Sequence, residues 1–317
     1  MSTNVPSAFL CQLLLRLHVI KQYKAVVSST VIQFLSANFD ERKTKPIIVM
    51  MHGFPECSWA WEAYLIALQK DYCVIAPDLP GYNFSIGFEN HKNYQIGNLI
   101  KTFSEFFTYL LTQSTQQKIH LIAHDWGGAI AWPLAAFHAE LLQSLTIINA
   151  AHPSTFTREM QNNPSQQQKS EYINDLISED AVANMKRNNF SMFTSLFTNT
   201  KTVLTSQQKQ KYSEQWMDDS NLANMAAYYQ HMPQLKTQST KVTTNLRIPN
   251  IHIRLPTLVL WGEQDSAFVE ENLDGLEQWV NDLRIVRFKD DGHWVAHHQL
   301  QAITQSIKAF LTPNLSP

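Results

Sequence analysis

The chain contains 317 residues, of which 44% are hydrophobic and 16% charged, a balance typical of a soluble globular protein rather than of a disordered or fibrous one. With 25 Lys and Arg against 27 Asp and Glu, no general attraction to nucleic acid or to an acidic membrane surface is expected. The three cysteines, Cys11, Cys57 and Cys73, have no CxxC spacing, which argues against a disulfide scaffold or a zinc ribbon and favours a reducing, cytoplasmic compartment.

The first apolar segment covers residues 8–15, where Gln12 interrupts the run and Arg16 follows it. No basic residue precedes the run, so it is a poor secretory signal. It is also far shorter than the ~20 apolar residues that a membrane-spanning helix needs. We expect a short helix packed on the protein, with a peripheral membrane contact as the alternative, and no stable membrane insertion.

Short apolar runs that each stop at a loop recur along the chain and predict buried parallel strands. They cover residues 47–51, 72–76, 119–123, 145–148, 257–260 and 283–288. An earlier pair of strands, around 26–28 and 31–34, is expected to form an antiparallel edge. Helical spacing over residues 100–111 and 128–142 separates some of the strands, so we expect a mostly parallel sheet with helices on both faces.

The alternation of strand and helix stops between about residues 151 and 249, where the sequence is rich in Gln, Asn and Met. An unstructured loop of that length is uncommon inside a compact domain, so we expect an inserted helical cap. The predicted organisation is a first core segment at residues 1–150, a cap at 151–249 and a second core segment at 250–317.

An aspartate stands at the end of one predicted strand, where open α/β sheets bind their ligands. Asp125 follows the run 119–123 and is itself followed by Trp126, two glycines and a helical stretch. This is the position of the nucleophile in a strand–turn–helix elbow, where small neighbours are needed because the turn is tight. The alternatives are a buried structural carboxylate or a helix N-cap, since Asp is a favoured cap.

An acid and a histidine follow later in the chain, in the order that a nucleophile–acid–histidine triad takes in this kind of sheet. Asp265 comes after the run 257–260, and His293 lies on the loop after the last predicted strand. Asp290 and Asp291 are competing acids, although their position after the last strand fits the order less well. The sequence therefore predicts a triad of Asp125, Asp265 and His293.

Five segments carry a resemblance to a known family. They read HGFPE at 52–56, DLPGYNFS at 78–85, HDWGG at 124–128, WGEQD at 261–265 and GHW at 292–294. In order and spacing they resemble the motifs of the epoxide hydrolase branch of the α/β-hydrolase family, over nearly the whole chain from about residue 23 to 310. The resemblance implies an α/β-hydrolase fold, with a mostly parallel eight-stranded sheet, helices on both faces and an inserted helical cap.

The expected reaction follows from the chemistry of these residues as well as from the resemblance. A carboxylate nucleophile suits attack by Asp125 on an sp³ carbon with a leaving group, which gives an alkyl-enzyme ester. His293, oriented by Asp265, would then activate water to cleave the ester and release a vicinal diol. The backbone amides of Phe54 and Trp126 are expected to form the oxyanion hole.

Opening an epoxide also requires a donor to the departing oxygen, which in the family is a pair of cap tyrosines. The segment 224–230 resembles the second tyrosine segment and places Tyr229 at the key position, although Tyr228 stands where Trp is common and Gln230 where Arg is common. Tyr172 is the candidate for the first tyrosine, after a one-residue shift. The alternative is that these tyrosines are core aromatics of the cap.

An apolar pocket for a small epoxide substrate is expected around the nucleophile. Its predicted lining consists of Phe54, Trp126, Tyr228 and Trp294, which could instead simply fill the core. No metal or organic cofactor is implied, because His293, His297 and His298 have no carboxylate or cysteine partner at ligand spacing. The oligomeric state stays open.

Two other functions compete with epoxide hydrolysis. A haloalkane or haloacid dehalogenase would share the triad and the ester, and the indole N–H of Trp126 could hold a halide. However, Phe54 stands where the haloalkane pattern has Asn, and Trp126 where the haloacetate branch has Arg. A non-catalytic ligand-binding protein on the same fold is the second alternative, although such proteins often lose a triad member.

Overall fold

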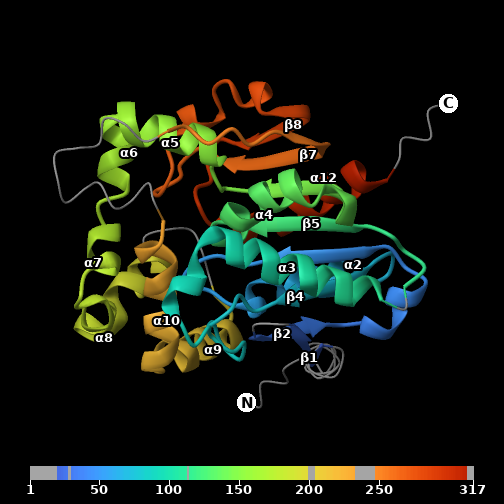
Figure 1. The fold of residues 1–317 in the computed structure, drawn as a ribbon, viewed down its shortest axis with the longest axis horizontal. Coiled ribbons are helices and arrows are strands. Elements are labelled where there is room, and N and C mark those ends of the chain that lie inside the picture. Colours follow the sequence, from blue (N-terminus) through green and yellow to red (C-terminus); the bar gives the residue numbers. More distant parts are fainter. Residues whose placement is uncertain (1–19, 28–29, 113, 199–203, 233–246, 313–317) are drawn as a thin grey trace, which may run out of the picture.

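The structure is a computed structural model that describes residues 20–27, 30–112, 114–198, 204–232 and 247–312. A single eight-stranded sheet forms its centre (Figure 1). In chain order the strands are β1 (Lys21–Val27), β2 (Thr30–Ser36), β3 (Ile47–Met51), β4 (Cys73–Pro77), β5 (Ile119–His124), β6 (Leu142–Ile148), β7 (Ile253–Gly262) and β8 (Val280–Phe288). The helix predicted at residues 8–15 lies outside the described residues.

The strands lie in the order β1-β2-β4-β3-β5-β6-β7-β8 across the sheet. β1 pairs with β2, and β2 with β4, in antiparallel fashion, whereas the other neighbouring pairs are parallel. The prediction of a mostly parallel sheet with an antiparallel edge is confirmed. The edge strands are longer than the predicted 26–28 and 31–34, because polar residues such as Lys21, Lys24 and Gln33 interrupt their apolar signal, which is weaker than in the central runs.

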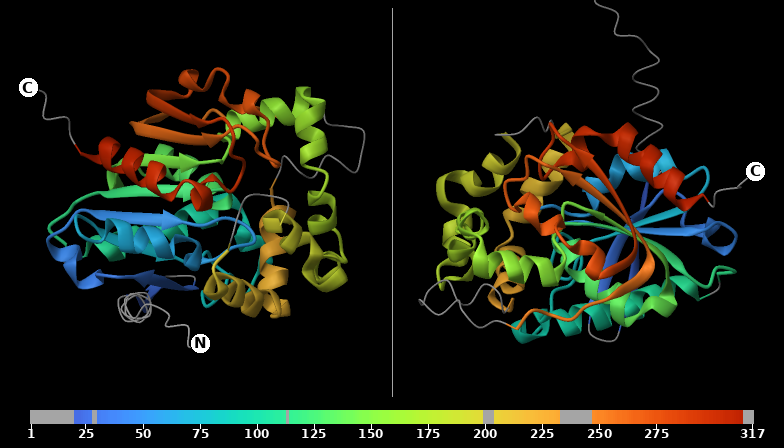
Figure 2. Two further views of the ribbon diagram at one scale, coloured as in Figure 1. Left: turned by 180° about the vertical axis from the view of Figure 1, so that it is seen from behind. Right: turned by 90° about the horizontal axis from the view of Figure 1, so that it is seen from above.

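Helices cover both faces of the sheet (Figures 1 and 2). On one face lie α3 (Ile96–Leu111) and α4 (Trp126–Phe137), and on the other α2 (Glu62–Leu68) and α12 (Leu300–Leu311). β3 contributes to both sides of the core: Ile47 and Val49 pack in one buried cluster and Ile48 in the other. Successive side chains of a strand point to opposite faces, so a continuous apolar run fits a strand covered on both sides.

α4 differs from the helix predicted over residues 128–142. It begins at Trp126 and ends at Phe137, and Leu142 already belongs to β6. Ala139, Leu141 and Leu142 extend the helical spacing in the sequence, but residues 139–141 form a short 3-10 helix and Leu142 pairs with Ile119 of β5. The pairing with a distant segment therefore makes residue 142 part of a strand, where the local pattern predicts a continued helix.

Between β6 and β7 the chain forms helices, which lie at the carboxyl ends of the parallel strands (Figure 1). They are α5 (Pro153–Asn162), α6 (Pro164–Lys169), α7 (Ile173–Ile177), α8 (Ala181–Thr198), α9 (Ser206–Trp216) and α10 (Asp219–Gln230). The backbone of α8 breaks at residues 187–190. None of the described helices of the chain is long and apolar enough to cross a membrane.

Candidate active site

Asp125 occupies a tight turn between β5 and α4, with φ 49° and ψ −118°. The residues that follow in α4, Gly127 and Gly128, must be small for a steric reason. A Cβ at Gly127 would lie 2.5 Å from the Met51 carbonyl oxygen, and one at Gly128 would lie 2.3 Å from Cβ of Ala150. Asp125 stands at the N-cap position of α4, but its carboxylate makes no capping hydrogen bond to the helix, so the side chain is available for other partners.

The three predicted triad residues lie together at the ends of three strands. Nδ1 of His293 is 2.9 Å from Oδ2 of Asp265, and Nε2 of His293 is 3.6 Å from Oδ2 of Asp125. The backbone amides of Ala267 and Phe268 donate to Oδ1 of Asp265 at 2.6 and 2.9 Å. These bonds fix the Asp265 carboxylate, which in turn fixes the ring of His293.

The electrostatics of the site favour an anionic Asp125 beside a protonated His293. Burial alone would raise the pKa of Asp125, but the hydrogen bond and charge of His293, with the Phe54 amide, hold it below 3.8. Burial alone would lower the pKa of His293, but the charge of Asp265 and hydrogen bonding with Asp125 and Asp265 raise it to about 10. At neutral pH the carboxylate is therefore charged and able to act as a nucleophile.

The loop after β3 brings the backbone amide of Phe54, one of the two predicted oxyanion donors, to the Asp125 carboxylate. The Phe54 amide donates to Oδ1 of Asp125 at 2.7 Å. His52 holds this loop, because its Nε2 accepts from the Leu79 amide at 3.0 Å and its Nδ1 lies 2.9 Å from the Gly53 carbonyl oxygen. The amide of Trp126, at the first position of α4, stays a prediction as the second donor.

A cavity of about 660 Å³ opens beside Asp125 and is lined mainly by apolar side chains. Tyr172 and Tyr229 both line it, with ring centroids 6.4 Å apart. Burial raises the pKa of Tyr229, and the neighbouring Tyr172 and Asp125 raise it further. Burial, followed by the charge of Asp125, also raises the pKa of Tyr172. Both phenols therefore keep their protons and remain hydrogen-bond donors.

The predicted lining of the pocket is only partly correct. Trp126 and Tyr228 line the cavity, whereas the side chains of Phe54 and Trp294 are not on its wall. Phe54 packs edge-on against Tyr229, and Trp294 packs against the ring of His293 from behind. The hydroxyl of Tyr228 donates to the Pro80 carbonyl oxygen at 2.9 Å, so it is not available to a substrate.

Asn149, which directly follows β6, was not among the predicted site residues, but it contacts Asp265. Its Nδ2 donates to Oδ2 of Asp265 at 2.6 Å and to the Gly262 carbonyl at 3.1 Å, and its Oδ1 accepts from the Gly262 amide at 2.8 Å. The residue adopts φ 37°, a conformation that Asn tolerates better than most side chains. An Asn directly after a strand, at the edge that binds ligands, was the available signal.

The buried carboxylate of Glu56 is a second feature for which the sequence predicted no role. Oε1 of Glu56 accepts from the Tyr212 hydroxyl at 2.7 Å and lies 2.7 Å from Nε2 of His297, and Oε2 is 3.7 Å from Nδ1 of His124. Nε2 of His124 is 3.0 Å from the His293 carbonyl oxygen. Glu56 therefore connects α9, the end of β5 just before Asp125 and the loop that carries His293.

The histidines near the C-terminus have separate carboxylate partners. His293 contacts Asp265, His297 contacts Glu56 and His298 contacts Asp291. In the described part of the chain no group of His, Cys, Asp and Glu side chains could hold a metal ion. Cys57 and Cys73 are buried free thiols.

Comparison with known proteins agrees with this geometry. The chain matches the family described as alpha/beta hydrolase fold over residues 46–298, and it belongs to that family. It is 28% identical to Epoxide hydrolase 4 of Mus musculus over 84% of this chain and 73% of the relative. It is also 28% identical to the AB hydrolase superfamily protein YfhM of Bacillus subtilis, over 85% and 91% of the two chains.

Solved structures of epoxide hydrolases are also similar to this chain. An epoxide hydrolase of Bacillus megaterium, crystallised in complex with an inhibitor, is similar with a TM-score of 0.79 and 27% identity, over 91% of this chain and 99% of that one. An epoxide hydrolase found in metagenomes from hot environments gives a TM-score of 0.82 at 25% identity, over 92% and 99%. The predicted α/β-hydrolase fold is confirmed.

Proposed function

We propose that this chain is an epoxide hydrolase that converts an epoxide and water into a vicinal diol through an ester on Asp125. The observation that carries the proposal is that two protonated tyrosines, Tyr172 and Tyr229, line the same apolar cavity as the anionic Asp125. A nucleophile and oxygen-directed donors around one cavity match what ring opening requires. The similarity to proteins named epoxide hydrolase supports the same activity.

In the first step Oδ2 of Asp125 attacks one carbon of the oxirane while the carbon–oxygen bond at that carbon breaks. The released oxygen takes a proton or a hydrogen bond from Tyr229 and Tyr172, so that it leaves as an alcohol rather than as a bare alkoxide. Oδ1 of Asp125, which accepts from the Phe54 amide, becomes the carbonyl oxygen of the ester.

In the second step water attacks the ester carbon. His293 accepts a proton from this water, Asp265 stabilises the resulting imidazolium, and negative charge develops on Oδ1 of Asp125. The Phe54 amide, with the Trp126 amide as the second donor, stabilises that charge. Collapse of the intermediate breaks the bond between the ester carbon and the alkyl oxygen, which leaves with the proton held by His293 and so completes the diol. The proton left on the Asp125 carboxyl returns to the tyrosine that gave its proton in the first step, which restores the carboxylate, and no cofactor takes part.

The test is to trap the ester. In a His293→Gln variant the first step is retained and the second is blocked, so intact-protein mass spectrometry should show a gain equal to the mass of the epoxide. An Asp125→Ala variant is the matched control and should gain no mass. A folded His293→Gln protein that never gains this mass from any of a panel of epoxides would contradict the covalent mechanism.

A haloalkane or haloacid dehalogenase would form the same kind of ester, so the leaving group decides between the two functions. The ring of Trp126, whose N–H could hold a halide, packs edge-on against Tyr229 with ring centroids 5.1 Å apart, and the two tyrosines on the cavity wall favour the epoxide. The discriminating assay compares halide release with diol formation. Halide release from haloalkanes, without diol from any epoxide, would replace epoxide hydrolysis by dehalogenation.

A non-catalytic ligand-binding role would require that the intact triad turns over no epoxide at all.

In our proposal residues 151–249 act as the cap that carries Tyr172 and Tyr229 over the core formed by residues 1–150 and 250–317. We also propose a cytoplasmic location, because buried free thiols such as Cys57 and Cys73 are typical of a reducing compartment.

A further inference from the structure

The cavity beside Asp125 extends along one side of α4. The α4 residues on its wall include Trp126, Ala129, Pro133 and Phe137. Residues that recur every third or fourth position lie on one face of a helix, so they form a continuous stripe from the first turn of α4 to its last residue. We call these residues the α4 stripe.

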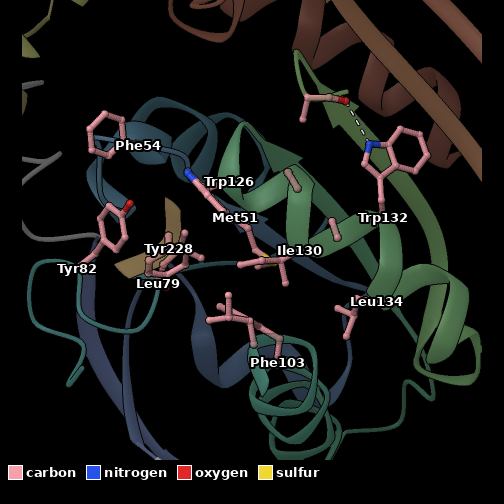
Figure 3. Packing of buried hydrophobic residues seen from close by; sticks show 14 of the residues in the cluster. Met51, Phe54, Leu79, Tyr82, Phe103, Trp126, Ile130, Trp132, Leu134 and Tyr228 are labelled. Atoms are coloured by element: carbon pink, nitrogen blue, oxygen red, sulfur yellow. Dashed lines mark hydrogen bonds between the residues drawn. The ribbon is translucent and has the colours of Figure 1, made fainter. Parts of the chain in front are cut away.

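The other sides of α4 have different contacts (Figure 3). Ile130 and Leu134 lie toward Phe103 of α3, and the indole of Trp132 donates to the Ala150 carbonyl oxygen at 3.1 Å. The helix is thus packed into the core on these sides. The α4 stripe is the side that faces open space.

The two ends of the α4 stripe differ in their access to solvent. The side chain of Asp125, just before the helix, is 11% exposed. At the far end Phe137 is 63% exposed, and Ile96 of the neighbouring α3, also on the cavity wall, is 39% exposed. The nucleophile therefore lies at the closed end of a groove whose open mouth lies beside the C-terminal end of α4.

The length of the groove follows from helix geometry. A helix rises 1.5 Å per residue, so Trp126 and Phe137 are separated by roughly 16 Å, about the length of an extended twelve-carbon chain. The cavity volume of about 660 Å³ leaves room for such a chain in addition to the oxirane. A small epoxide alone would leave most of the apolar surface uncovered.

The walls of the groove carry little charge. Apolar side chains from three further segments, such as Ile100, Pro153 and Ile251, face the α4 stripe, and within the described residues no Lys or Arg lines the cavity. Besides Asp125 and four tyrosines, the ionisable lining residues are His138 and His231. A charged group along the apolar walls would lose its hydration with no Lys or Arg beside it, whereas an alkyl chain would bury apolar surface.

We propose that the α4 stripe binds an unbranched, uncharged apolar chain of about ten to twelve carbons attached to the oxirane, and that it sets the preference of the enzyme for chain length. This inference rests on the proposed epoxide hydrolase activity. It assigns Ala129 and Phe137 as residues that determine specificity, because Ala129 leaves the groove open next to the nucleophile and Phe137 forms its mouth.

The test is a series of terminal epoxides with straight chains from four to sixteen carbons. Each buried methylene raises kcat/KM by up to roughly fourfold. The increase should continue along the groove and level off at about twelve carbons, where the chain reaches the mouth. A kcat/KM that does not change with chain length, or one that falls beyond six carbons, would overturn the proposal.

Two substitutions locate the effect, and the measured quantity is the ratio of kcat/KM for the twelve-carbon and four-carbon epoxides. Ala129→Phe fills the groove near Asp125 and should lower this ratio at least tenfold. Ala63→Phe is the matched control, since Ala63 is an exposed residue of α2 on the other face of the sheet and is not on the cavity wall, and it should keep the wild-type ratio. A reduced ratio in Ala63→Phe, or an unchanged one in Ala129→Phe, would contradict the assignment.

A variant at the mouth avoids the risk of misfolding, because Phe137 is largely exposed. Phe137→Asp places a charge beside the far end of the chain and should lower the twelve-carbon to four-carbon ratio, whereas Phe137→Leu should retain most of it. An unchanged ratio in Phe137→Asp would mean that the chain does not reach the mouth, and would overturn the assignment of the α4 stripe.

Measuring the binding of unreactive alcohols tests the groove independently of the proposed activity. The dissociation constants of butan-1-ol and dodecan-1-ol, measured by calorimetry, should differ in favour of the longer alcohol, and Ala129→Phe should remove most of the difference. If no epoxide is hydrolysed but this difference is present, the activity is wrong and the groove is retained. If epoxides are hydrolysed but both alcohols bind equally, the groove is wrong and the activity is retained.

Discussion

His293 lies between two carboxylates, with Nδ1 2.9 Å from Oδ2 of Asp265 and Nε2 3.6 Å from Oδ2 of Asp125. The pair raises the pKa of His293 to about 10 against the effect of burial. A histidine that is protonated at neutral pH cannot act as a base. Ester formation removes the charge of Asp125, and with it one of the two influences that hold the proton on His293.

The two chemical steps should therefore depend differently on pH. Ester formation needs the Asp125 anion, whose pKa is lowered by the neighbouring His293 against the effect of burial, so the rate of ester formation should be nearly constant from about pH 6 to 9. Ester hydrolysis needs neutral His293, so its rate should rise with pH and level off at an apparent pKa below the value of about 10 in the free enzyme. Rapid-quench measurements of single turnovers separate the two rates, and a hydrolysis rate that falls with rising pH would contradict this assignment.

The two tyrosines should act in ring opening. Tyr229→Phe and Tyr172→Phe should each lower the rate of ester formation by roughly 10- to 100-fold, because a positioned proton donor contributes on this scale, and the double variant should be slower than either. Tyr228→Phe is the control. Its hydroxyl donates to Pro80, so its loss should cost about 1 kcal/mol of unfolding free energy and leave ester formation within a few-fold.

Those rates come from stopped-flow changes in tryptophan fluorescence, with Trp126 5.1 Å from the ring of Tyr229 as a reporter. Equal rates for the wild type and the Tyr172→Phe, Tyr229→Phe double variant would remove both residues from the mechanism. The epoxide assignment would then lose its main support.

Gly53 is expected to tolerate no side chain. A Cβ there would lie 2.3 Å from Cβ of Asp125 and 2.6 Å from its Oδ1, so Gly53→Ala must displace the nucleophile or the oxyanion loop. A displacement of about 1 Å can cost roughly a hundredfold in rate. Steady-state kcat is the measurement. Gly97→Ala adds the same methyl group where nothing lies within 4 Å, and a similar loss there would show that the steric explanation is wrong.

Asn149 should act as a positioning residue. Asn149→Ala removes its hydrogen bonds to Asp265 and Gly262 and should lower the unfolding free energy by about 2–3 kcal/mol. Because Asn149 helps to fix the Asp265 carboxylate, its loss lets this carboxylate move relative to Nδ1 of His293. The pH profile of ester hydrolysis should then shift together with a fall in kcat. Thermal unfolding and the pH profile are measured on the same samples. A loss of stability with an unchanged profile would leave Asn149 a purely structural residue.

Glu56 should couple the cap to the core. Burial alone would raise the pKa of Glu56, but His297 and His124 hold it well below its usual value. Glu56→Gln weakens the contacts with Tyr212 and His297 and should lower the unfolding free energy by about 3 kcal/mol. In a double-mutant cycle with Tyr212→Phe the two losses should not add. Glu140→Gln, at an exposed carboxylate, is the control and should stay within about 0.5 kcal/mol.

The sequence by itself determined the sheet and the position of the triad. Apolar runs such as 47–51 identify strands because strands buried on both faces must be apolar at every position. In a parallel sheet the carboxyl ends of neighbouring strands meet at one edge, so residues directly after runs, such as Asp125, come together without knowledge of side-chain packing. The prediction of the triad used the residues that follow the strands together with the resemblance of the segments around Asp125, Asp265 and His293 to epoxide hydrolase motifs.

Only the tertiary structure decided which side chains face the cavity and which partners hold the site. Phe54 and Trp294 stand beside site residues in the sequence, yet packing turns their rings away from the cavity wall. Glu56 meets Tyr212 of the cap across 156 positions of the chain, and Asn149 meets Asp265 across 116. Local patterns contain no information about such pairs, because the direction of a side chain and its distant partner depend on how the helices pack on the sheet.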